Sequence, residues 1–197
     1  MVNIPKDEIK RKGIHFATLL YVLGYWYFSK TIVISGLILL IAVIAFLEFL
    51  RFKIIKLNNF FKTNFKGYYR NEETNKVSGL IGTLSGALLT ILMFSNRHIV
   101  LASFLYLVFG DSLAALVGKS FGKHRIIFTK KTLEGTLACF FACFFIGIFI
   151  FNLQFAFIGA IISAIVEAIP WKINDNFWMQ ILNALFLTLL SNAICIR

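Results

Sequence analysis

The chain has 197 residues, of which 59% are hydrophobic, and its formal net charge is +11. A soluble domain of this length is typically about 45–50% apolar, so the composition indicates an integral membrane protein, and we expect a single membrane domain over residues 1–197. Such a charge would suit a nucleic-acid binder, but in a membrane protein it more often reports topology. We expect no nucleic-acid partner, and nothing in the sequence indicates an oligomer.

Seven apolar segments are candidates for transmembrane helices, because a span needs about 20 apolar residues. They lie near 13–29, 31–50, 77–95, 98–118, 133–151, 154–169 and 176–196. The fifth and sixth form one long run that we divide at Asn152, so counts of six and eight stay open. The sequence therefore predicts an all-α, polytopic helix bundle with about seven transmembrane helices.

The basic residues alternate between the two sides of such a bundle. With the N-terminus inside, the inner segments hold seventeen of the 20 Lys and Arg residues. These inner segments are 1–12, 51–76, 119–132 and 170–175. Because cytoplasmic loops carry an excess of Lys and Arg, we predict that the N-terminus is cytoplasmic and the C-terminus lies outside.

The acidic residues all lie at or near the same inner face. Four of them, Glu48, Asp111, Glu134 and Glu167, fall within separate predicted helices or at their inner ends. Carboxylates at membrane depth are costly and usually have a function. Salt bridges with loop lysines would account for them structurally, but we favour a metal–phosphate site just inside the cytoplasmic surface.

The first and third spans carry weaker signals. The first opens on Arg11, Lys12 and His15, and we expect His15 to lie at the membrane interface, in a snorkelling or capping role. The third contains Gly82 and Gly86, and small residues at four-residue spacing favour close helix packing.

The fourth span carries Asp111 about two turns before Lys119, which places the carboxylate roughly 10 Å from the inner helix end. Mg²⁺ is a hard cation that binds carboxylates together with phosphate oxygens. Asp111 is therefore a candidate magnesium ligand, and a hydrogen bond to a neighbouring helix is the structural alternative.

A basic, glycine-rich loop follows this span. Gly118, Lys119, Gly122 and Lys123 suit close approach of backbone and ammonium groups to phosphate. The loop is not a P-loop, because the spacing GxxxxGK[ST] requires a glycine where Leu113 stands. An ordinary positive loop would have a similar composition.

The fifth span begins with a cap and an acid. Thr132 is a candidate N-cap, with Glu134 and Gly135 in the first turn. A helix N-terminus attracts anions, and Lys130 and Lys131 beside it strengthen the case for a polyphosphate site.

The sixth span ends at Glu167, and the seventh begins at Asp175 and Asn176. Asp175 or Asn176 is a candidate helix cap. Together with Glu167, these residues also supply oxygen ligands or a proton acceptor, which is the functional interpretation.

Taken together, these segments resemble the family of CTP-dependent lipid-alcohol kinases, which includes dolichol kinase, phytol kinase and CTP-dependent diacylglycerol kinase. The matching pieces are RKGIH at 11–15, EFLR at 48–51, KVSGLIG at 76–82, GDSLAALVGKSFGK at 110–123, KKTLEGT at 130–136, EAIP at 167–170 and DN at 175–176. The resemblance covers almost the whole chain, and its central pair of motifs is the specific part.

The resemblance implies an enzyme that transfers the γ-phosphoryl group of CTP to the hydroxyl of a membrane lipid alcohol: a polyprenol or dolichol, phytol or diacylglycerol. Mg²⁺ would be held by Asp111 and Glu134. Catalysis would involve Asp111, Glu134, Glu167, Asp175 and His15. The phosphates would be bound by Gly118, Lys119, Gly122, Lys123, Lys130, Lys131, Thr132 and Gly135. The lipid headgroup would be flanked by Arg11, Lys12 and His15.

The central motifs also resemble phosphatidate cytidylyltransferase, so a CTP:lipid-phosphate nucleotidyltransferase is the alternative. That family has a Gly-His-Gly-Gly run near its C-terminus, whereas no histidine follows His124 here. A departure from the kinases is that 177–180 replaces a short apolar–proline stretch. A non-enzymatic transporter is a second alternative, disfavoured because the outer half of every predicted span is uncharged. We expect no additional N-terminal spans of the eukaryotic dolichol kinase type, and we expect a bacterial or archaeal cytoplasmic membrane rather than the endoplasmic reticulum.

Overall fold

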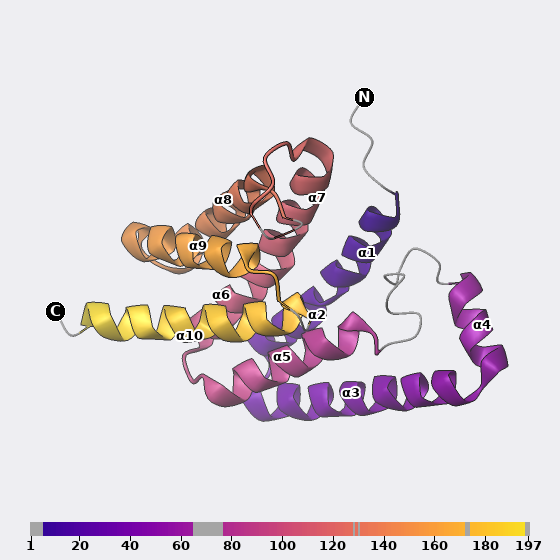
Figure 1. Ribbon diagram of the computed structural model, residues 1–197. Helices are drawn as coiled ribbons and strands as arrows, with labels where there is room; N and C mark the ends of the chain where they lie inside the picture. The colour runs from indigo at the N-terminus through magenta and orange to yellow at the C-terminus, as the bar shows by residue number, and fades with distance from the viewer. Residues whose placement is uncertain (1–5, 65–76, 128, 130, 172–173, 196–197) are drawn as a thin grey trace.

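The computed structural model describes residues 6–64, 77–127, 129, 131–171 and 174–195, and in these residues regular structure is helical throughout (Figure 1). The helices are α1 (Lys6–Ala17), α2 (Leu19–Tyr27), α3 (Lys30–Lys53), α4 (Ile55–Asn64), α5 (Gly79–Met93), α6 (Arg97–Leu105), the π-helix η2 (Tyr106–Asp111), α7 (Ser112–Phe121), α8 (Leu133–Ile150), α9 (Leu153–Ala168) and α10 (Asp175–Cys195). The sole extended pairing in the described residues is an isolated bridge between Arg125 and Thr132. The all-α prediction is confirmed.

Each predicted apolar segment is occupied by helix. The division at Asn152 is a true helix boundary, because its side chain caps α9 by accepting from the Phe155 N–H at 2.8 Å. Three features were not predicted. The first segment is interrupted at Thr18 between α1 and α2, and the fourth contains the π-helix η2. Helix α4, which follows α3, was also not predicted.

Within the described residues, three helices are long and apolar enough to cross a bilayer: Lys30–Lys53, Arg97–Phe121 and Leu133–Ile150. Helices α5 and α9 are apolar but shorter. These helices are compatible with a membrane protein, whereas the count of seven spans stays a prediction.

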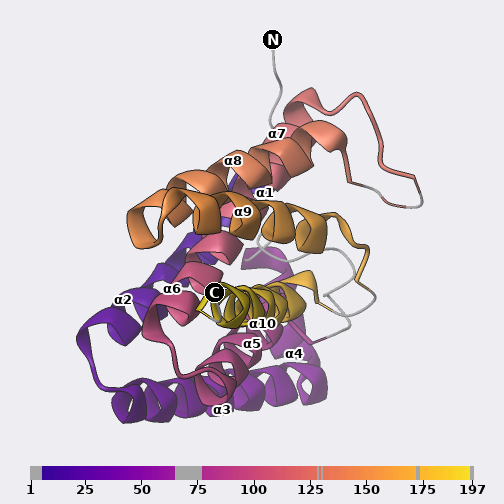
Figure 2. The same cartoon turned by 90° about the vertical axis from the view of Figure 1, so that its left-hand side faces the viewer.

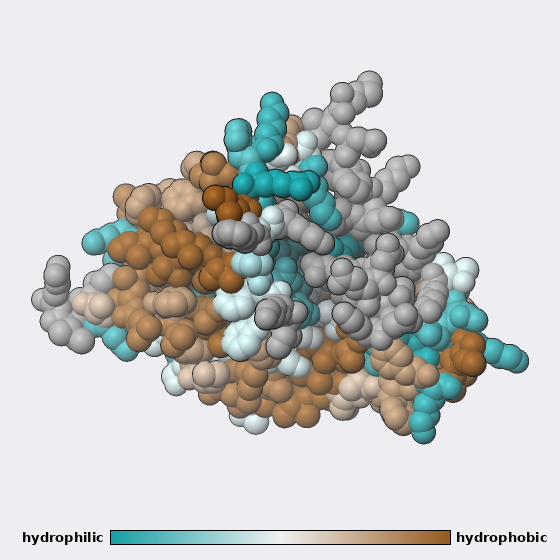
Figure 3. All heavy atoms as spheres, viewed as in Figure 1, coloured by the Kyte–Doolittle hydropathy of each residue, from teal (hydrophilic) through white to brown (hydrophobic). Residues whose placement is uncertain are grey.

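The helices run back and forth between two sides of the molecule. In Figure 1, the α7–α8 and α9–α10 connections and helix α4 lie to the right of the α2–α3, α5–α6 and α8–α9 connections. Figure 2 shows α8 and α9 side by side as a hairpin, with α10 beneath them and α3 along the bottom edge. In Figure 3, brown apolar surface covers the left and lower parts, and hydrophilic residues gather around the upper end and around α4.

The centre of the bundle is the α6–η2 segment. In the most apolar stretch of Arg97–Phe121, 67% of the residues are buried, whereas 17% are buried in the corresponding stretch of α3. Helix α3 is therefore peripheral, whereas α6 and η2 are surrounded by protein, with Phe104, Tyr106 and Leu107 fully buried. Whatever η2 carries at its end is consequently held by a packed core.

Close packing of α5 against α10 depends on small residues, as the sequence predicted. A Cβ on Gly86 would lie 2.9 Å from the Phe177 carbonyl oxygen, and one on Gly82 would overlap the Asn174 side chain. The absence of these side chains lets the two backbones approach. This contact fixes the N-terminal end of α10, which bears Asp175.

Candidate functional site

Asp111 is the last residue of the π-helix η2. π-helical turns are rare and frequently occur at functional sites. The Asp111 side chain is 14% exposed, and its carboxylate forms an ion pair with Lys12 of α1. The same Lys12 ammonium donates to the Asp111 main-chain carbonyl at 3.1 Å. The buried aspartate is thus charge-compensated by a residue 99 positions earlier in the chain.

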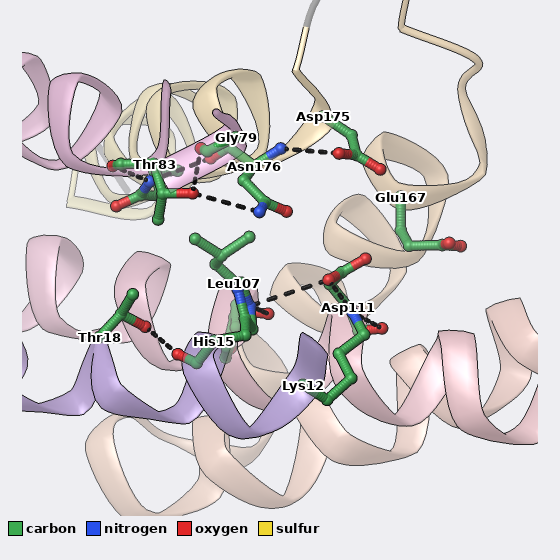
Figure 4. Close-up of polar contacts among 12 residues, drawn as sticks. Lys12, His15, Thr18, Gly79, Thr83, Leu107, Asp111, Glu167, Asp175 and Asn176 are labelled. Atoms are coloured by element: carbon green, nitrogen blue, oxygen red, sulfur yellow. Dashed lines mark hydrogen bonds and ion pairs between the residues drawn. The ribbon is translucent and has the colours of Figure 1, made fainter. Parts of the chain in front are cut away.

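His15 lies one turn after Lys12 on α1 and faces the same carboxylate. Its Nε2 is 3.8 Å from Asp111 Oδ2 and 3.3 Å from the Leu107 carbonyl oxygen within η2. The histidine side chain is buried, at 7% exposure. Helix α1 therefore presents two nitrogen side chains to Asp111, as Figure 4 shows.

Glu167, near the end of α9, forms a second buried ion pair. Lys131 Nζ lies 3.1 Å from Glu167 Oε1 and also donates to the Glu167 main-chain carbonyl. The Thr136 hydroxyl of α8 donates to Glu167 Oε2 at 3.2 Å. A carboxylate at 6% exposure is thereby satisfied on both oxygens.

These two pairs belong to one electrostatic group. The Lys131 charge acts on Asp111 more weakly than Lys12 and His15 do, and the Asp175 charge acts weakly on His15. Figure 4 shows Asp111, Glu167 and Asp175 in one neighbourhood where η2, α9 and α10 meet. We refer to the residues of this group as the Asp111 cluster: Lys12, His15, Asp111, Lys131, Glu167 and Asp175.

A polar network holds Asp175 in place. The Asn176 side chain donates to Thr83 Oγ1 at 3.2 Å, and the Asn174 side chain donates to the Gly79 carbonyl at 2.6 Å. Gln180 donates to the Thr83 carbonyl at 2.9 Å. Sequence reasoning missed Thr83, Asn174 and Gln180, because nothing in their spacing shows that α5 and α10 are neighbours.

The loop and glycine residues form a separate structure, the α7–α8 corner, consisting of Gly118, Gly122, His124, Thr132, Glu134 and Gly135. The Glu134 carboxylate accepts from the backbone N–H groups of Lys123 at 3.1 Å and His124 at 3.2 Å. It also pairs with His124 Nδ1 at 2.7 Å. The hydrogen bonds of Glu134 thus anchor the loop that precedes α8.

The glycines of the corner allow α7 and α8 to touch. A Cβ on Gly135 would lie 2.7 Å from the Ala114 carbonyl oxygen, and one on Gly118 would lie 2.8 Å from Thr132 Oγ1. Thr132 caps α8, as predicted, by accepting from the Gly135 N–H at 3.2 Å. In this structure, the close approach permitted by these glycines is used for helix packing.

The remaining predicted residues lie in several places. Lys119 and Lys123 are exposed, and Arg11 is partly buried on α1. Lys130 lies outside the described residues. Glu48 forms an ion pair with Arg51 in its own helix, at 2.7 Å, and this partner differs from the loop lysines considered in the structural alternative. The structure therefore brings together His15, Asp111, Glu167 and Asp175, but holds Glu134 in the corner.

The oxygen donors of the Asp111 cluster are those that Mg²⁺ prefers. In the part of the chain that the structure describes, however, no three His, Cys, Asp or Glu side chains are arranged to hold a metal ion. Mg²⁺ commonly binds through one or two carboxylates, with the remaining ligands from water and substrate phosphate. The cluster fits that mode of binding and does not fit an all-protein cage.

No protein-family model and no solved structure matches this chain. The chain is similar to an uncharacterized protein of Rickettsia prowazekii (strain Madrid E), with 26% identity over 136 residues. The matched region covers 68% of this chain and 65% of that protein.

Proposed function

We propose that the protein is a CTP-dependent kinase that phosphorylates the hydroxyl of a membrane lipid alcohol. The observation that carries this proposal is the Asp111 cluster, in which three carboxylates and two lysines from five parts of the chain meet within an apolar helix bundle. Phosphoryl transfer depends mainly on positioning and on neutralising charge. The cluster supplies groups of both signs for this chemistry.

The two lysines are suited to the phosphates. Lys12 and Lys131 each compensate a carboxylate through an ammonium group with three donors. A polyphosphate beside them would share those donors, and its charge would be stabilised in a partly buried site. The exposed Lys119 and Lys123 would attract the nucleotide to this end of the molecule.

The carboxylates have two proposed roles: one binds the cation, and another accepts the proton of the lipid hydroxyl. Asp111 is the residue that we assign to Mg²⁺, whose charge would neutralise the phosphate oxygens. Glu167 is assigned as the group that accepts the proton of the lipid hydroxyl, because Thr136 beside it shows that an alcohol hydroxyl can donate to Oε2. Asp175 and His15 would position these groups.

The proposed setting is a bundle of seven spans with a cytoplasmic N-terminus. The helices run between two sides, and helix α4 and the C-terminal end of α7, which belong to segments expected to face the cytoplasm, lie toward one of them in Figure 1. This arrangement supports access of CTP from the cytoplasm to the Asp111 cluster.

The decisive experiment uses the position of a radiolabel in CTP. Purified protein in lipid nanodiscs is incubated with Mg²⁺ and a panel of prenols, phytol and diacylglycerol. A kinase transfers label from γ-labelled CTP to the lipid and releases CDP. Transfer from α-labelled CTP to phosphatidate, with release of pyrophosphate, would select the cytidylyltransferase alternative. Absence of labelled lipid with every acceptor would contradict both enzymes.

A further inference from the structure

An apolar groove of about 430 Å³ lies between α8 and α9. Its walls come from Leu137 and Phe140 on α8 and from Ile161 and Ile165 on α9, with Ala164 and Ala168 one turn apart. Ile161 and Ile165 are exposed by 38% and 57%. Figure 3 shows brown apolar surface over the region of these helices. The groove therefore opens toward the hydrocarbon of a bilayer.

One end of the groove, which is apolar throughout its lining, lies beside the Asp111 cluster. Thr136 is one of its lining residues, and the Thr136 hydroxyl donates to Glu167 Oε2 at 3.2 Å. Ala168, another lining residue, directly follows Glu167. Glu167 is paired with Lys131, so the Thr136 hydrogen bond links this end of the groove to the charged group.

We propose that this groove binds the single hydrocarbon chain of a lipid alcohol, with its hydroxyl at Thr136 and Glu167. The inference rests on the proposed function and specifies its acceptor: a single-chain alcohol of the prenol type in preference to diacylglycerol. At about 30 Å³ for each water-sized group, the groove holds roughly 14 such groups. That volume suits one hydrocarbon chain, and because the groove is open on its outer side, the second acyl chain of a diacylglycerol would have to lie outside it.

A second apolar groove, of about 320 Å³, is a poorer candidate. It lies between α2, α6 and α8, and His98 is among its lining residues. His98 precedes Asp111 by thirteen residues in the continuous Arg97–Phe121 helix, which corresponds to about 20 Å at 1.5 Å per residue. An alcohol bound there would have its hydroxyl far from the Asp111 cluster.

The test is a binding measurement that does not require turnover. A prenol of about 15 carbons that carries a diazirine in its chain, matched to the volume of the groove, is photolysed with the protein in nanodiscs. Peptides are then mapped by mass spectrometry. We expect labelling of α8 near Phe140 and of α9 near Ile161. Unlabelled prenol should prevent this labelling at a concentration at least about tenfold lower than the concentration of diacylglycerol that is required.

Ile161→Trp fills the end of the groove that is farther from Glu167 and should reduce this labelling at least about fivefold. The matched control is Ile38→Trp, at a lipid-exposed position of α3 that does not line the groove, which should leave labelling unchanged. Ile161→Ala enlarges the groove and should shift competition toward longer prenols. Thermal melts identify any variant whose folding has changed.

Each outcome separates this inference from the proposed function. Labelling confined to other helices, equal competition by diacylglycerol, or equal effects of Ile161→Trp and Ile38→Trp in folded protein would each overturn the groove assignment. Groove labelling without transfer of phosphate from CTP would retain the binding site and reject the kinase. Transfer of phosphate to a prenol that does not label the groove would retain the kinase and reject the groove as its binding site.

Discussion

Asp111 and the α7–α8 corner are near neighbours in sequence, but the Asp111 cluster and the corner satisfy their polar groups in opposite ways. In the corner, Glu134 bonds to His124 and to backbone N–H groups no more than eleven residues away. In the cluster, Asp111 pairs with Lys12 from the first helix, and Glu167 pairs with Lys131 across 36 residues. The corner is a local structure, whereas the cluster exists only after distant helices have packed. The corner therefore shapes the backbone locally, whereas the cluster brings charged side chains together from distant parts of the chain.

The largest effect is expected for Asp111→Asn. Removing a preorganised charge from a catalytic site typically costs about 100- to 1,000-fold in rate, so phosphate transfer from CTP should fall by at least that factor. Full activity of the variant would show that the cluster is structural.

The Lys12–Asp111 pair also permits a stability measurement. Loss of one partner of a buried pair typically costs about 3–5 kcal/mol, so Asp111→Asn and Lys12→Met should each lower the unfolding temperature. The double variant should be more stable than the sum of the two effects predicts. Strict additivity would mean that the two side chains do not interact in solution.

Glu167→Gln should reduce turnover by about 100-fold, within the range for loss of a general base. The amide retains the shape and the contact with Thr136. We therefore expect kcat to fall while KM for the lipid alcohol changes little. If KM rises and kcat does not change, Glu167 orders the acceptor and another group accepts the proton.

Gly135→Ala tests the corner through packing. The new Cβ would lie 2.7 Å from the Ala114 carbonyl oxygen and 3.3 Å from Gly118 Cα. Overpacking of this kind costs about 1–3 kcal/mol, and a thermal melt measures it. Leu137→Ala, at a 48% exposed position on the same helix, is the control for a generally unstable α8. A Gly135→Ala protein of normal stability but without activity would support the sequence-based assignment of Gly135 to phosphate binding.

The smallest effect is expected for Glu134→Gln. His124, its partner, is 76% exposed, and exposed ion pairs contribute little, so activity should change by less than about threefold. This variant separates the two regions most directly. Loss of activity as severe as that of Asp111→Asn would restore Glu134 as a second metal ligand, as the sequence alone predicted.

Much of the fold could be predicted from the sequence because helix positions follow from apolar runs. The boundary at Asn152 and the cap at Thr132 were also predictable, since both depend on side chains within three residues of the backbone that they bind. The π-helix was not, because Tyr106–Asp111 continues the same apolar run. The pairing of Lys12 with Asp111 was equally inaccessible, because it depends on how α1 packs against α7 and η2.

The π-helix has a consequence for the phase of the longest helical segment. One turn of η2 accommodates more residues than an α-turn, so everything after Asp111 is rotated relative to an uninterrupted α-helix, by about 100° for one added residue. The two halves of the segment therefore face different directions around the helix axis. The core around Phe104 fixes the orientation of the first half, and the contact of Gly118 with Thr132 fixes that of the second. Asp111 lies at the junction of the two halves. Deletion of a single residue there would leave both halves helical, but it would rotate one relative to the other, so that their packing faces would no longer both meet the neighbouring helices.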